Sequence, residues 1–130
     1  MGVISSMSPE RDLITFLTSY PEEMAFGDAE PGEILDRYFT TDFEYYNDGL
    51  LLDRERLIAH VRPVRTNVVG VRVEVHEALV SGDRIAARYT MHADTRKSGV
   101  LVTEVCMFGH LAADGRIRRV DQITRIAPKA

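Results

Sequence analysis

The sequence has little of what disulfide-bonded, membrane-spanning or secreted proteins need. Its 130 residues include one cysteine, Cys106, which excludes an intramolecular disulfide. No apolar run approaches the ~20 residues that a membrane-spanning helix requires. Residues 1–7 form a loose leader without the charged segment and long apolar segment of a secretory signal. We therefore expect a cytoplasmic protein that does not enter a membrane.

An excess of one charge is also lacking. The 16 basic and 20 acidic residues are spread along the chain and give a formal net charge of -4. Nucleic acids are bound by extended basic surfaces, so we expect no nucleic-acid partner. The four histidines have no metal-ligand spacing, and the scattered glycines form no phosphate-binding loop. We expect neither a metal site nor a cofactor.

What is present predicts one domain whose first half is helical. An apolar fraction of 45% in a chain of this length suffices for a single core. After a cap at Ser8, apolar residues recur at helical spacing over Leu13–Met24, and Pro21 should kink or divide this helix. We expect a second helix over Pro31–Phe39 and a third from Asp53 to a stop at Pro63.

The second half predicts strands, because the apolar period changes from 3.6 to 2 after Asn67. A short strand, Phe43–Asn47, precedes the third helix and ends in an Asp48-Gly49 turn. The later strands are expected around 71–75, 85–93, 100–111 and 116–126. The predicted fold class is α+β, with a strongly curved mixed or antiparallel sheet and three N-terminal helices on its concave face, enclosing an apolar pocket.

The strand over 100–111 is apolar on both faces. Leu101, Val105 and Met107 alternate with an apolar set that includes Cys106 and Phe108. A strand that is buried on both sides needs two covers, so we expect a homodimer that forms through the sheet. The alternative is that terminal segments or loops cover the second face.

Three segments carry a resemblance to a known family. They are Tyr38–Phe43 entering the first strand, Asp53–Glu55 before the third helix, and Asp114–Ile117 before the last strand. In this order and spacing they resemble the nuclear transport factor 2-like superfamily, which has a cystatin-like fold, and within it the SnoaL-like group that includes polyketide cyclases. The resemblance implies a single cone-shaped domain over residues 8–127 with a pocket for a small hydrophobic ligand.

The catalytic patterns of that superfamily fit only in part. Asn47 stands where ketosteroid isomerases place a carboxylate base, and an amide cannot accept a proton at neutral pH. Tyr45 and Asn47 resemble the pair that holds water in limonene epoxide hydrolase, but Tyr89, Met91 and Gln122 replace its charged residues. The cyclases use a late-strand aspartate. Here Asp121 corresponds to it, although the alternation puts Val120, Gln122 and Thr124 on the pocket face and Asp121 on the other.

Two carboxylates remain as alternative catalytic candidates, Glu104 and Asp121. Glu104 lies between Val102 and Cys106 on one strand face, where poor solvation would suit acid-base chemistry unless an arginine such as Arg88 pairs with it or it reaches the rim. Around them we expect a ligand-binding set of Tyr45, Asn47, Tyr89, Met91, Cys106, Phe108, His110 and Gln122. His110 is expected at the rim, and Cys106 as a small apolar residue.

The predicted function is therefore a pocket for a small hydrophobic metabolite. One hypothesis is a cofactor-independent isomerase, cyclase or dehydratase that uses a carboxylate for acid-base chemistry, with a tyrosine stabilising an oxyanion. The other is a non-catalytic dimeric binding or scaffold module, which the incomplete catalytic patterns favour. The sequence does not decide between the two.

Overall fold

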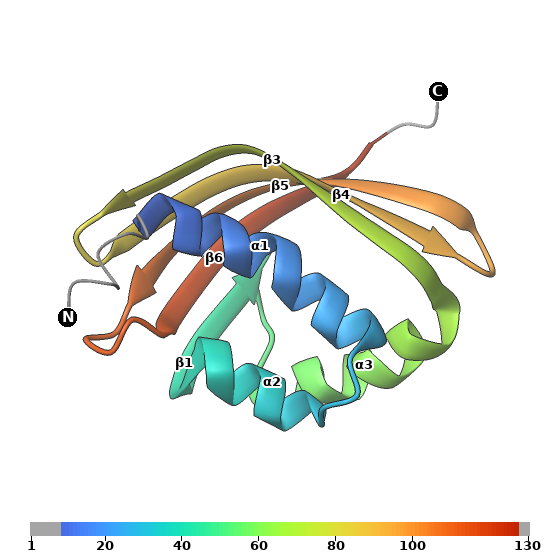
Figure 1. The fold of residues 1–130 in the computed structure, drawn as a ribbon, viewed down its shortest axis with the longest axis horizontal. Coiled ribbons are helices and arrows are strands. Elements are labelled where there is room, and N and C mark those ends of the chain that lie inside the picture. Colours follow the sequence, from blue (N-terminus) through green and yellow to red (C-terminus); the bar gives the residue numbers. More distant parts are fainter. Residues whose placement is uncertain (1–8, 128–130) are drawn as a thin grey trace.

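The computed structural model describes residues 9–127, which form three helices and one six-stranded sheet (Figure 1). The helices are α1 (Pro9–Phe26), α2 (Pro31–Tyr38) and α3 (Arg54–Asn67), and the strands are β1 (Phe39–Asn47), β2 (Leu50–Leu51), β3 (Val68–Ser81), β4 (Arg84–Thr95), β5 (Gly99–Leu111) and β6 (Ile117–Ile126). The expected leader over 1–7 and the cap at Ser8 lie outside the described residues. None of the three helices combines the length and apolarity that crossing a bilayer requires.

The sheet has the strand order β2-β1-β6-β5-β4-β3. β1 runs parallel to β6, and every other neighbouring pair is antiparallel. The sheet is curved and does not close on itself, and the helices lie along its concave side (Figure 1). The predicted α+β class with a curved mixed sheet is confirmed.

Both internal prolines lie within continuous helices. α1 runs through Pro21, between the buried Leu17 and Met24 that hold it to the core. The expected stop of the third helix at Pro63 is wrong, because α3 continues to Asn67. Proline removes the hydrogen bond to the carbonyl four residues earlier, here that of Ala59. Ala59 and Pro63 are both exposed, so water can satisfy that carbonyl and the helix is not forced to end.

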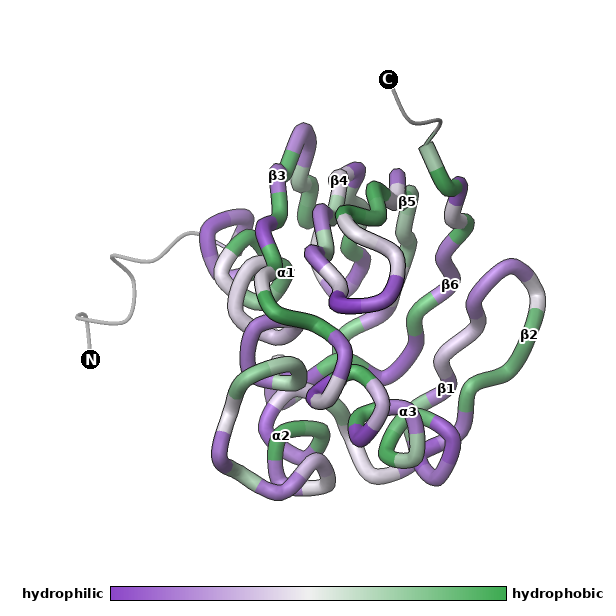
Figure 2. The backbone as a smooth tube through the Cα atoms, turned by 90° about the vertical axis from the view of Figure 1, so that its right-hand side faces the viewer, coloured by the Kyte–Doolittle hydropathy of each residue, from purple (hydrophilic) through white to green (hydrophobic). Residues whose placement is uncertain are grey.

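The strands separate polar from apolar side chains by alternation, and Figure 2 shows hydrophilic and hydrophobic colours changing along β6. Facing residues on paired strands share a side of the sheet. Tyr89 pairs with Val105, and Val105 with Thr124, so these three lie on the concave side. The residues immediately before and after each of these three in its own strand lie on the convex side.

The core fills the space between α1, α2 and the concave side. Phe39, Ile34, Leu35 and Val120 are its largest fully buried side chains. An aromatic cluster extends it, in which the Phe39 ring packs against Phe16, Tyr20, Phe43 and Tyr45. This cluster fixes the side of α1 that faces the sheet.

An arginine joins α3 to the end of α1. Arg65 donates from Nε to the Met24 carbonyl at 3.0 Å and from Nη2 to the Ala29 carbonyl at 3.0 Å and the Glu23 carbonyl at 3.4 Å. The last carbonyls of a helix have no partner within it, and a cation is favourable at that end. Arg65 therefore fixes the position of α3 relative to α1.

Candidate functional site

A cavity of about 570 Å³ lies between the helices and the concave side of the sheet. Side chains from α1, α3, β1 and β3 to β6 line it, and most of them are apolar. The polar lining residues are Tyr20, Tyr45, Asn47, His60, Asn67, Tyr89, Thr95, Thr103, Gln122 and Thr124. The volume is within the range of about 300–1,000 Å³ that is usual for small-molecule sites.

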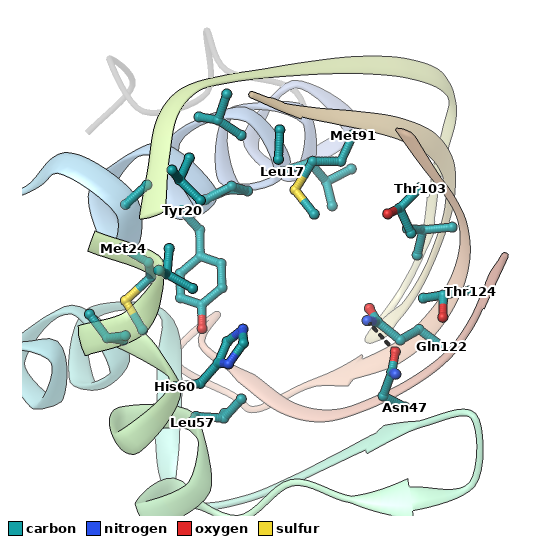
Figure 3. Close-up of a pocket in the computed structure, with 18 of the residues that line it drawn as sticks. Leu17, Tyr20, Met24, Asn47, Leu57, His60, Met91, Thr103, Gln122 and Thr124 are labelled. Carbon is teal, nitrogen blue, oxygen red and sulfur yellow. Dashed lines mark hydrogen bonds between the residues drawn. The ribbon is translucent and has the colours of Figure 1, made fainter. Parts of the chain in front are cut away.

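Asn47 and Gln122 form one polar wall at the junction of β1 and β6 (Figure 3). Gln122 Nε2 donates to Asn47 Oδ1 at 2.8 Å. Behind this pair Asp48, at the turn after β1, accepts from Asn47 Nδ2 at 3.3 Å and from Thr124 Oγ1 at 2.5 Å. The Thr124 amide also donates to Asp48, at 2.9 Å. These bonds from Thr124 lower the pKa of Asp48, so its carboxylate stays ionised at neutral pH.

The opposite wall carries Tyr20 from α1 and His60 from α3, both directed into the cavity in Figure 3. Sequence reasoning placed neither in the pocket. The signal was available for His60, because Leu57, His60, Val61 and Val64 recur at the spacing of one helix face. A histidine on the apolar face of a helix that packs on a pocket is a candidate to line that pocket.

The cavity tyrosines keep their protons. Burial, followed by the proximity of Tyr45 and Tyr89, raises the pKa of Tyr20. Burial likewise raises the pKa of Tyr89. It raises the pKa of Tyr45 to about 12, and a hydrogen bond from Gln122 opposes part of that rise. All three hydroxyls are therefore neutral hydrogen-bond donors at physiological pH.

The lining carries no fixed charge, since none of the described residues around the cavity is Asp, Glu, Lys or Arg. His60 contributes an imidazole ring to the lining, with two ring nitrogens that can take part in hydrogen bonds. Over residues 9–127, no three His, Cys, Asp or Glu side chains gather closely enough to hold a metal ion. The arrangement can bind a neutral molecule by apolar contact and by neutral hydrogen bonds.

Five of the predicted ligand-binding residues line the cavity together. They are Tyr45, Asn47, Tyr89, Met91 and Gln122. The sequence also placed Val120 and Thr124 on the pocket face, and both are there. The concave faces of β1, β4 and β6 follow the predicted alternation.

Both candidate catalytic carboxylates lie outside the cavity. Glu104 is on the convex side, where it accepts from Arg125 at 2.7 Å, whereas Arg88 pairs with Glu77. Asp121 is also on the convex side, as the alternation predicted, and forms a two-bond ion pair with Arg119. Neither carboxylate is desolvated in the cavity, so the expected pocket position of Glu104 is wrong.

The expected cavity positions of Cys106, Phe108 and His110 are also wrong. The register sets Cys106 opposite Arg88 and Ile123, and Phe108 opposite Ala86 and Asp121, all on the convex side. Cys106 is exposed, and 66% of Phe108 is exposed. His110, next along the same face, lies outside the cavity lining. The cavity is lined instead by the other face of β5, including Thr103, Val105 and Met107.

Three helices packed on the concave side of a curved mixed sheet, with a cavity between them, define the class of fold. The SnoaL-like domain family matches residues 18–120, and the chain belongs to this family within the NTF2-like superfamily. No curated protein matches the chain.

Solved structures agree on the fold. AclR, a putative hydroxylase from Streptomyces galilaeus, superposes with a TM-score of 0.70 at 12% identity, over 93% of this chain and 83% of that one. A putative SnoaL-like polyketide cyclase from Jannaschia sp. CCS1 gives 0.66 at 13% identity, over 89% and 85%. A protein with a ketosteroid isomerase-like fold from Catenulispora acidiphila, in complex with trimethylamine, gives 0.60 at 13% identity, over 85% and 83%.

Proposed function

We propose that the chain binds a neutral, largely apolar small molecule in the cavity between its helices and its sheet. The observation that carries the proposal is the lining itself, which is mostly apolar and contains neutral hydrogen-bonding groups without any fixed charge. Burying an ion without a partner costs several kcal/mol, whereas a neutral molecule gains from the apolar contact. The cavity therefore favours neutral over ionised ligands.

Binding of the neutral dye Nile red tests this proposal. Met91 lines the cavity, whereas the side chain of its neighbour Thr90 lies on the other face of β4. We expect wild type and Thr90→Trp to enhance Nile red fluorescence, and Met91→Trp, which fills the cavity, to abolish the enhancement. Equal enhancement in all three proteins would place the dye elsewhere and refute the proposal.

A catalytic role is the second candidate function, and the putative polyketide cyclase among the similar structures favours it. The geometry gives no support to a carboxylate mechanism, because Glu104 and Asp121 are on the far face of the sheet. His60 and the neutral tyrosines are the groups that could assist proton transfer on a molecule in the cavity. His60→Gln would then abolish turnover of any substrate found while retaining its binding.

We also propose that a second copy covers the convex side. Phe108 is 66% and Ile123 70% exposed there, and the ladder places them close together through the pairs Cys106–Ile123 and Phe108–Asp121. The surrounding ion pairs, Arg119–Asp121 and Arg125–Glu104, balance both signs, so the face can meet an identical one. Sedimentation equilibrium should show a dimer for wild type and a monomer for Ile123→Asp. A monomeric wild type at 100 μM would contradict the proposal.

A further inference from the structure

The cavity is closed at one end and open at the other, as the exposure of its sheet residues shows. On the concave side of β4, exposure rises from the buried Tyr89 to the half-buried Met91. On the neighbouring β5 it rises from the buried Val105 to the half-buried Thr103 and the exposed Leu101. The ladder pairs the two strands in this same order, so both open toward the same end. Met91 therefore lies between the closed part and the open part of the cavity.

Three methionines line the cavity, and of these three Met91 is the one with room to change conformation. Met24 on α1 and Met107 on β5 are buried members of the core. Met91 is half-buried, and over residues 9–127 it belongs neither to that core nor to the half-buried side chains that pack against it. A methionine is unbranched and has several rotatable bonds, so packing alone can fix its rotamer. Such packing is present at Met24 and Met107 and lacking at Met91.

The sheet residues next to Met91 have short side chains. Thr103 faces it from β5, and Ala93 follows it on the same face of β4. Figure 3 shows the Met91 side chain with its sulfur extending from β4 into the cavity. Rotation about its torsions therefore moves the sulfur and the terminal methyl group within the cavity. Each rotamer leaves a different length of free space for a ligand.

We propose that Met91 sets the length of the apolar chain that the cavity accepts. Its side chain folds aside for a long ligand and fills the space beside a short one. A short ligand in a rigid cavity would leave a void, and the atoms that line a void lose contact partners. A movable thioether removes part of that loss. This assignment rests on the proposed binding function and adds a residue that determines specificity.

A series of straight-chain primary alcohols, from 1-hexanol to 1-dodecanol, tests the assignment. These probes are neutral and differ only in chain length, and isothermal titration calorimetry measures their dissociation constants without a dye. We expect the dissociation constant of the wild type to fall about fourfold with each added methylene, the factor for ~0.8 kcal/mol. The fall should stop at the chain length that the cavity accepts. This length limit is the quantity to compare between variants.

Two substitutions of Met91 should move the limit in opposite directions. Met91→Ala removes the movable atoms and should lengthen the limit by about two carbons. Met91→Phe should shorten it by a similar amount, because phenylalanine is bulky and has fewer torsions with which to fold aside.

The neighbouring position supplies matched controls. Thr90→Ala and Thr90→Phe should leave the limit unchanged, since the Thr90 side chain lies on the other face of β4. Leu57→Ala is a second control, because it truncates a lining residue that packs against the core, and it should shift the limit less than Met91→Ala does. Thermal melts verify that each variant is folded.

The outcomes separate the two proposals. If Met91→Ala or Met91→Phe keeps the wild-type limit, or if Leu57→Ala lengthens it as much as Met91→Ala does, the cavity binds the alcohols but Met91 does not set their length. If Nile red binds and no alcohol does, the assignment is wrong and the binding function stands. If neither the dye nor any alcohol binds, the proposed binding function itself fails, and the assignment fails with it.

Discussion

Replacing Arg65 by methionine should destabilise the domain, because three backbone carbonyls lose a charged donor. Two of the three bonds, to Met24 and Ala29, are 3.0 Å long, and the third, to Glu23, is 3.4 Å. Methionine retains most of the aliphatic packing and cannot donate. The variant therefore isolates the contribution of the guanidinium.

The magnitude follows from the two shorter bonds. A hydrogen bond from a charged donor contributes about 1.5–3 kcal/mol, and the half-buried setting of Arg65 selects the lower end. Two such bonds give about 3 kcal/mol, a large share of the ~5–15 kcal/mol of a typical domain. For a chain of this size, about 4 °C per kcal/mol converts this to a fall of about 12 °C in Tm.

Thermal unfolding followed by circular dichroism measures the effect, with urea unfolding as a second measure. Arg62→Met is the matched control, since Arg62 is exposed on the same helix and should change Tm by less than about 2 °C. Arg65→Lys should be intermediate, because one ammonium cannot reach all three carbonyls as a planar guanidinium does. If Arg65→Met melts within 2 °C of Arg62→Met, the joint between α1 and α3 contributes nothing and the reasoning is refuted.

Two further predictions concern β6 and its neighbours. Hydrogen bonds from Thr124 lower the pKa of Asp48, so Asp48→Asn should destabilise the domain above pH 4. The difference should begin to shrink below the ordinary aspartate value of ~3.9 and disappear as pH falls through the lowered pKa of the folded state, which urea midpoints between pH 2 and 7 would follow. A difference that stays constant from pH 7 to pH 2 would contradict this. Gly109→Ala places a Cβ 2.6 Å from the Arg119 carbonyl and should cost about 1–3 kcal/mol in urea unfolding. Gly70→Ala, with a nearest contact at 3.7 Å, is its control, and equal losses would refute the steric argument.

Local periodicity predicted most of the fold, because each helix and each long strand carries its own pattern of apolar residues. The positions of the helices and of β3 to β6 could be predicted in this way, as could the concave face of β6. The continuation of α3 past Pro63 could not, since it depends on the exposure of the carbonyl that loses its partner. The two-residue β2 is too short to have a pattern.

The site was harder to predict than the fold. Alternation divides the side chains of one strand between two faces, but it does not say which face of the neighbouring strand lies on the same side of the sheet. β5 is apolar on both sides, so its sequence alone left the choice open. The pairing of Tyr89 with Val105 rather than Cys106 settled it. His60 was missed although it shares a helix face with Leu57, Val61 and Val64, because that face was identified from its apolar residues alone.

The bond between Gln122 and Asn47 joins residues 75 positions apart, from the first and the last long strands of the chain. Contacts between such distant segments form late in folding, and during synthesis β6 emerges only after every other element. A nascent chain that still lacks β6 has no binding wall, so a ligand cannot stabilise it. A ligand in the cavity would therefore favour molecules in which β6 is in place over intermediates that lack it.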